Sequence, residues 1–131
     1  MNYIRASVTF IDTFENITVV GFSAGAEELT MMALELDDSL LVGSVVTLAL
    51  KATTVSLAKE KSAMLSISNQ LPVRIQSLDM GKLLCSVKLS FGDTLMESII
   101  TKNSALRMDL RPQDEIVALL KASDLAIAEI L

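Results

Sequence analysis

The sequence predicts a mainly β protein built from two tandem small Greek-key barrels. A motif of lysine, alanine and a hydroxyl residue, followed by alternating apolar residues, occurs twice, in Lys51–Ala58 and Lys121–Ala128. Each motif closes a unit that opens about fifty residues earlier with asparagine, any residue and an aliphatic residue, at Asn2 and at Asn69. Because this repeat preserves polar residues as well as apolar periodicity, it indicates a site that is formed twice.

The length of 131 residues permits one ordinary domain or two very small ones, and the repeat favours two. We expect a first repeat at residues 1–58, a charged linker at 59–65 and a second repeat at 66–131. Units of this size bury a modest core and usually need a partner surface for comfortable stability.

The strands follow from apolar residues that alternate with polar ones, the period of a half-buried strand. In the first repeat we expect strands at Ile4–Phe10, Thr18–Phe22, Leu29–Leu34, Val45–Ala52 and Val55–Ala58. Their expected counterparts in the second repeat are Leu71–Ile75, Leu83–Phe91, Leu95–Ile100, Glu115–Ala122 and Leu125–Ala128.

Turn chemistry separates these strands around Gly25, Gly81 and Gly92. Between the third and fourth strands, Asn103–Leu110 is expected to form a short helix, which Arg111 and Pro112 end. The matching stretch of the first repeat, Asp37–Val42, is about four residues shorter and is expected to make a single turn. Five short strands with one short helix before the fourth describe an OB-like, partly open Greek-key barrel.

Composition excludes several classes of function. The net charge of −5 and the pI near 4.6 oppose direct binding of nucleic acid. No apolar stretch reaches the roughly 18 residues of a membrane-spanning helix, and no secretory signal is visible. The single cysteine cannot form an intrachain disulfide, which favours a cytoplasmic location. A hydrophobic content of 51% without a membrane segment favours a homo-oligomer.

The chain lacks the groups on which most catalysis depends. There is no histidine, and no glycine-rich phosphate loop is present. The adjacent carboxylates Glu27–Glu28 and Asp37–Asp38 are interpreted as solvated loop charges, and Cys85 as a buried structural thiol. We therefore expect a protein that is not an enzyme and that has no cofactor and no directly ligated metal.

The remaining polar groups are hydroxyls, backbone amides and lysines, which suit a tetrahedral oxyanion. The candidate oxyanion-binding residues are Ser66, Ser68, Asn69, Thr101, Ser104, Lys121, Ala122 and Ser123 of the second repeat, with Lys51 and Thr53 of the first. Two alternatives stay open, because Ser104 could act only as a helix cap and Lys121 only as a solvated strand-end lysine.

These motifs resemble the molybdate-binding Mop domains, also known as molbindin or TOBE domains, in the tandem di-Mop arrangement. The family's three motifs, in order, are matched by Ser66–Leu71, Thr101–Ser104 and Lys121–Leu125. Ser68 stands where the family has arginine. In the first repeat, an alignment of the strands sets Glu35 and Asp38 or Ser39 at the positions of the threonine and serine, so we expect a weaker first site.

The resemblance implies that molybdate or tungstate, with molybdenum present only as the oxyanion, binds between subunits without being chemically changed. It implies an intracellular molybdate- or tungstate-binding protein, or the sensing domain of a molybdate-responsive regulator. Two alternatives remain: a structural oligomerisation module that binds nothing, and the regulatory domain of a molybdate transporter ATPase. The opening at Met1 and Asn2 begins inside the family's first motif, which favours a DNA-binding or ATPase domain upstream.

Overall fold

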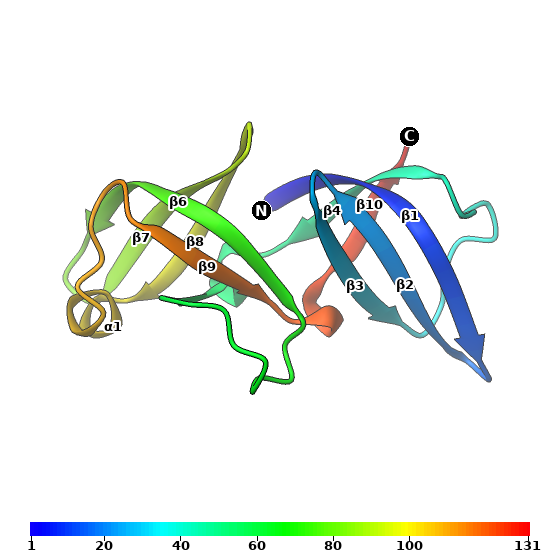
Figure 1. The fold of residues 1–131 in the computed structure, drawn as a ribbon, viewed down its shortest axis with the longest axis horizontal. Coiled ribbons are helices and arrows are strands. Elements are labelled where there is room, and N and C mark those ends of the chain that lie inside the picture. Colours follow the sequence, from blue (N-terminus) through cyan, green and yellow to red (C-terminus); the bar gives the residue numbers. More distant parts are fainter.

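Two curved antiparallel sheets lie side by side in the computed structural model, which describes residues 1–131 (Figure 1). The strands of the first repeat are β1 (Asn2–Phe14), β2 (Ile17–Ala24), β3 (Glu27–Ala33), β4 (Val45–Leu50) and β5 (Ser56–Ala58). Those of the second are β6 (Asn69–Met80), β7 (Leu84–Phe91), β8 (Thr94–Thr101), β9 (Glu115–Leu120) and β10 (Ala126–Ile130). The mainly β prediction is confirmed, and every predicted strand is present.

Each repeat supplies four strands in Greek-key order, but the fifth strand is exchanged. One sheet has the order β10-β4-β1-β2-β3 and the other β5-β9-β6-β7-β8. Thus β10 of the second repeat pairs with β4, while β5 of the first repeat pairs with β9. The expected boundaries at 58 and 66 describe repeats along the chain, whereas each sheet contains residues of both repeats.

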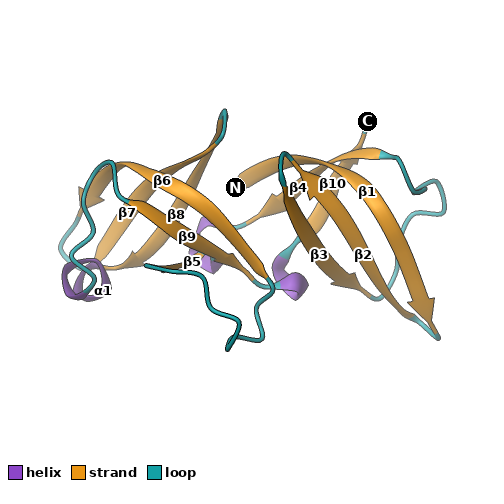
Figure 2. Cartoon of the chain, in the orientation of Figure 1, coloured by secondary structure: helices purple, strands orange, loops and turns teal.

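The exchange takes place through two short 3₁₀ turns, η1 (Ala52–Thr54) and η2 (Ala122–Asp124). The strands β4 and β9 therefore end before these turns, two residues earlier than the alternation of the sequence predicted. Figure 2 shows both turns at the junction of the two sheets.

The long strands β1 and β6 bend at matching bulges, which lets each sheet curl into an open barrel. The register shifts between Val8 and Phe10 in β1, and between Ile75 and Ser77 in β6. Before the bulge, each strand pairs with β4 or β9, and after it chiefly with β2 or β7. Apolar alternation fades after the bulge, so the sequence predicted both strands too short.

The interior is a single cluster of 26 buried apolar residues drawn from both sheets. Val55 and Leu125, which follow the two exchange turns, belong to it. Cys85 is completely buried on β7, as predicted. Burial, and next the nearby carboxylate of Asp79, raise the pKa of the Cys85 thiol, so it is a structural residue and not a nucleophile.

Two buried asparagines join the sheets to each other. The Asn69 side chain accepts a hydrogen bond from the backbone N–H of Thr30 at 2.7 Å and donates one to its carbonyl at 2.8 Å. The Asn2 side chain binds both backbone groups of Glu97 in the same way, each at 2.8 Å. Each amide thus pairs like a strand residue with the edge of the other sheet, β3 or β8.

The two repeats differ mainly in the connection before their fourth strand. In the second repeat this connection forms helix α1 (Lys102–Arg107), which is anchored by buried Ala105 and followed by buried Leu110. Residues 34–44 of the first repeat correspond to 101–114, so the first connection is three residues shorter, not four. It contains turns only, so the short helix before the fourth strand forms in the second barrel and not in the first, where a turn was expected. No helix has the length and hydropathy needed to cross a bilayer.

Asn2 and Asn69 act as clamps between the two sheets, and replacing either one should destabilise the fold. Asn69→Ala and Asn2→Ala each remove two hydrogen bonds and leave strand-edge groups unpaired, so we expect a loss of about 1–3 kcal/mol in the free energy of unfolding. Urea unfolding would measure it. Asn103→Ala, at an exposed position without a recorded hydrogen bond, is the matched control, and equal effects at all three positions would contradict the clamp.

The exchanged strands predict one cooperative unfolding transition for both sheets. Tyr3, the single tyrosine, lies on β1, and Cys85, the single cysteine, lies in the other sheet. In increasing urea, tyrosine fluorescence and the reactivity of the Cys85 thiol should report the same midpoint. Separate midpoints would mean that the sheets unfold independently.

Candidate oxyanion site

The repeated lysine motifs form the two exchange turns. Lys51 and Lys121 each follow the last, buried residue of a strand and adopt extended backbone angles, and a 3₁₀ turn follows. The carbonyl of Lys51 accepts bonds from the N–H of Thr54 at 3.0 Å and from its hydroxyl at 2.8 Å. The carbonyl of Lys121 accepts from the N–H of Asp124 at 2.9 Å. These bonds hold both lysines at the surface between the sheets.

Both lysine side chains are exposed, and neither forms an ion pair within the chain. Ala52 is buried beneath the first turn, and Ala122 is half-buried beneath the second. Thr53 and Ser123 are exposed. Each turn therefore presents one unpaired cation and one hydroxyl, which is the minimum set for an oxyanion.

Each turn packs against the third strand of the other repeat's sheet, η1 against β8 and η2 against β3. The hydroxyl of Ser98 on β8 is completely buried and donates to the carbonyl of Val55 at 2.6 Å, which ties η1 down. Sequence reasoning missed Ser98, because a serine inside an apolar strand carries no signal of its partner. On the other side, Ser123 lines a shallow pocket with four apolar residues: Ile17, Met32, Ala33 and Leu34.

Thr101 and Ser104 form the cap of α1. Thr101 Oγ1 accepts from the backbone N–H of Ser104 at 3.2 Å and lies 3.0 Å from Ser104 Oγ, to which it donates. Arg107 Nη2 donates weakly to Ser104 Oγ at 3.4 Å. The Ser104 oxygen therefore accepts twice, and its own proton remains free for a ligand. Thr101, rather than Ser104, is the N-cap residue.

Ser66, Ser68 and Asn69 lie at the entry to β6. Asn69 is opposite Leu120, so continuing the antiparallel register by one residue sets Ser68 opposite Lys121. Ser66 and Ser68 are exposed. The buried Asn69 amide pairs with both backbone groups of Thr30, which uses its oxygen and one of its two N–H groups.

The candidate residues consequently fall into two groups within one chain. The Lys121 corner contains Ser68, Lys121, Ala122 and Ser123 and lies against β3, and Ser66 lies two residues before Ser68 in the exposed chain that enters β6. The Lys51 corner lies against β8. That strand ends at Thr101, and Ser104 follows in α1. Figure 2 shows α1 at the far end of its sheet from η2.

The strand register also corrects the alignment of the first repeat. The hairpins β2–β3 and β7–β8 have equal lengths, with Gly25 and Gly92 at matching positive-φ turn positions. Leu84 pairs with Thr101, and the same register sets Ile17 opposite Leu34. Leu34 thus stands in place of the threonine, and the expected Glu35 does not. The connection that follows is three residues shorter and forms turns, so the register identifies no counterpart of Ser104.

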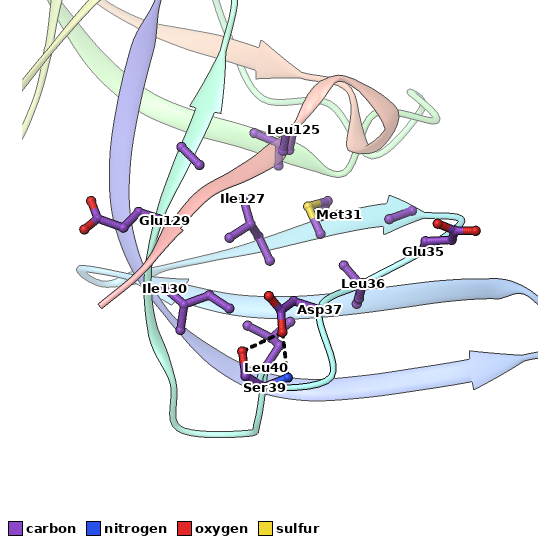
Figure 3. Close-up of a pocket in the computed structure, with 13 residues that line it drawn as sticks. Met31, Glu35, Leu36, Asp37, Ser39, Leu40, Leu125, Ile127, Glu129 and Ile130 are labelled. Atoms are coloured by element: carbon purple, nitrogen blue, oxygen red, sulfur yellow. Dashed lines mark hydrogen bonds between the residues drawn. The ribbon is translucent and has the colours of Figure 1, made fainter.

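The carboxylates gather next to the Lys121 corner, because Ala33 lines both their groove and the pocket beside Ser123. A groove of about 500 Å³ separates β10 from the connection after β3, and Glu35, Asp37 and Glu129 line it (Figure 3). Hydrogen bonds from the side chain and backbone N–H of Ser39 lower the pKa of Asp37. An anion would be repelled here. No group of three or more potential metal-ligating side chains is present.

Comparison with known proteins supplies the family. Residues 65–127 match the model of the TOBE domain. The second repeat is a TOBE domain. This finding confirms the resemblance to the Mop or TOBE family that the three motifs indicated. Among curated protein sequences there is no significant match.

The tandem arrangement has a counterpart among solved structures. The chain superposes on the cytoplasmic molybdate-binding protein ModG, in a crystal form with molybdate bound, with a TM-score of 0.88 and 25% sequence identity. The match covers 96% of this chain and 94% of that one, so it includes both the TOBE domain and the first repeat.

Ser98→Ala should loosen the η1 turn. The substitution leaves the buried carbonyl of Val55 without its partner, so we expect a loss of about 1–3 kcal/mol in the free energy of unfolding. Thermal unfolding would measure it, with Ser77→Ala at an exposed strand position as the control. A loss no larger than that of the control would show that the bond is dispensable.

Proposed function

We propose that this chain is a cytoplasmic binding protein for molybdate or tungstate and that it does not chemically change its ligand. The superposition on ModG, whose structure holds molybdate, supports the ligand class and the location. The absence of histidine and the burial of the single cysteine agree with a role in binding alone.

We assign the tight site to the Lys51 corner, formed by Lys51, Thr53, Thr101 and Ser104. The observation that carries this assignment is an unpaired ammonium on a turn that packs against β8, the strand whose end carries the Thr101–Ser104 cap. A tetrahedral dianion would take the lysine charge together with neutral donors, including the free proton of Ser104. The site combines the turn of the first repeat with the helix start of the second.

We infer a weaker site at the Lys121 corner. Ser66, Ser68 and Ser123 offer hydroxyls there, and Lys121 offers a charge. Leu34 supplies no donor at the position of Thr101, and Asp37 adds a negative charge in the groove next to this corner. The sequence alone had favoured a strong site within the second repeat, and the exchange of strands changes which groups meet.

We further propose that the protein is a homo-oligomer. Large apolar side chains beside the corners are exposed, Leu34 by 67%, Leu83 by 80% and Leu84 by 55%. A second copy that covers them would also exclude water from a bound anion. Within a longer chain that carried a DNA-binding or ATPase domain, the same module would serve as a molybdate sensor or as a transporter regulator.

Isothermal titration of the full chain with molybdate, tungstate, sulfate and phosphate tests the ligand class. We expect tight binding of molybdate and tungstate and about one tight oxyanion per chain. Absence of binding for all four would instead support the structural oligomerisation module. Two equally tight sites per chain would refute the asymmetry between the corners.

The two lysines should differ in their effects. Lys51→Ala should weaken molybdate binding by roughly 1.5–3 kcal/mol, the range for hydrogen bonds to charged groups, and Lys121→Ala should weaken tight binding less. Arg5→Ala, which removes an exposed and unpaired cation on β1, controls for net charge. The reverse order would assign the tight site to the Lys121 corner.

A further inference from the structure

The groove beside β10 has the features of a docking surface for a cationic segment. Its wall and floor are apolar and include Met31, Leu36, Leu40, Ile127 and Ile130, which come from β3, the following connection and β10 (Figure 3). The groove has a volume of about 500 Å³ and is open to solvent.

The groove exists because the first repeat lacks a helix. In the second sheet, α1 occupies the connection after β8 and buries Ala105 in the core. The equivalent connection after β3 is three residues shorter and has turns only, so the seam between β3 and β10 stays uncovered.

The groove carries an unbalanced negative charge. Glu35, Asp37 and Glu129 surround the apolar floor, and no lysine or arginine lines it. None of the three carboxylates forms an ion pair within the chain. The Ser39 hydrogen bonds lower the pKa of Asp37. A segment that binds in this groove should therefore carry an apolar side chain flanked by positive charges.

The outer surface of α1 has the complementary features. Leu106 is 59% exposed, with Lys102 one turn before it and Arg107 next to it. Neither Lys102 nor Arg107 has a carboxylate partner within the chain. This short helix thus presents an apolar side chain between two unpaired cations.

The helix and the groove belong to opposite ends of the molecule, α1 at the outer end of one sheet and β10 in the other (Figure 1). One chain cannot bring them together. We propose that α1 of one copy docks into the groove of a second copy, with Leu106 on the apolar floor and Lys102 and Arg107 against the carboxylates. This proposal rests on the proposed self-association and specifies its interface.

Such a contact joins two different surfaces and is therefore head-to-tail. Repeated contacts of this kind close into rings or extend into chains, according to the rotation between neighbours. The groove of each copy then receives from its neighbour the helix that its own first repeat lacks.

Charge reversal tests the contact in the full chain by sedimentation velocity over a range of protein concentrations. Glu35→Lys with Glu129→Lys reverses the charge of two side chains that form no ion pair within the chain. Lys102→Glu with Arg107→Glu reverses the helix. Each pair alone should weaken self-association by about tenfold or more, and the combined fourfold variant should restore it to within about threefold of the native value.

Matched controls isolate the contact from net charge and from general apolar exposure. Arg5→Glu with Lys61→Glu changes the charge as much as the helix reversal does, and should leave self-association unchanged. Leu106→Ser should weaken it, whereas Leu95→Ser, at a leucine that is 76% exposed on β8, should not.

The outcomes separate this interface from the proposed function. Self-association that survives both reversals would overturn the helix–groove contact alone. Weakening by the groove reversal without any effect of the helix reversal would assign the groove to another occupant and overturn the proposal. A native chain that stays monomeric would overturn both self-association and this interface, while titration of the same chain with molybdate would still decide ligand binding.

Discussion

The exchange of the last strand of each repeat is the constraint on which the rest of the structure depends. Because β5 completes the sheet of the second repeat and β10 that of the first, neither repeat forms its full sheet from its own residues. The two buried asparagine clamps reinforce the same junction from the other edges. The lysine turns are the points where the chain crosses between sheets, so Lys51, Thr53, Lys121 and Ser123 lie at the junction because the fold crosses there.

The connection before the fourth strand is three residues longer in the second repeat than in the first, and this gives the two repeats different structures and charges there. The longer connection of the second repeat forms a capped helix, whose hydroxyls and cations face outward. The shorter connection of the first repeat makes turns, leaves a groove and brings carboxylates to its edge. One duplicated framework thereby carries a capped helix with hydroxyls and cations at one end and a groove with carboxylates at the other. Divergence of a single loop accounts for both.

Most of the fold could be predicted from local pattern. Alternation of apolar residues located all ten strands, since one face of each strand must be buried, and Gly25 and Gly92 marked hairpin turns that need positive φ. Errors arose where long-range contacts decide the ends of elements. The strands β1 and β6 continue beyond their bulges because β2 and β7 supply partners there, and β4 stops at Leu50 because the chain must cross to the other sheet.

The sequence by itself determined the two repeats, the class of fold, the buried thiol and the lysine, hydroxyl and amide groups that the ligand class needs. Tertiary structure alone decided which of those groups meet. Local periodicity indicates that one face of a strand is buried, but it does not indicate which sheet the strand joins. The exchange of β5 and β10 could therefore not be predicted from the sequence. The motif suggested Asn69 as a ligand group, but in the structure its side chain clamps the two sheets together. Its partner Thr30 lies 39 residues away on the edge of the other sheet, so the sequence pattern could not reveal the contact.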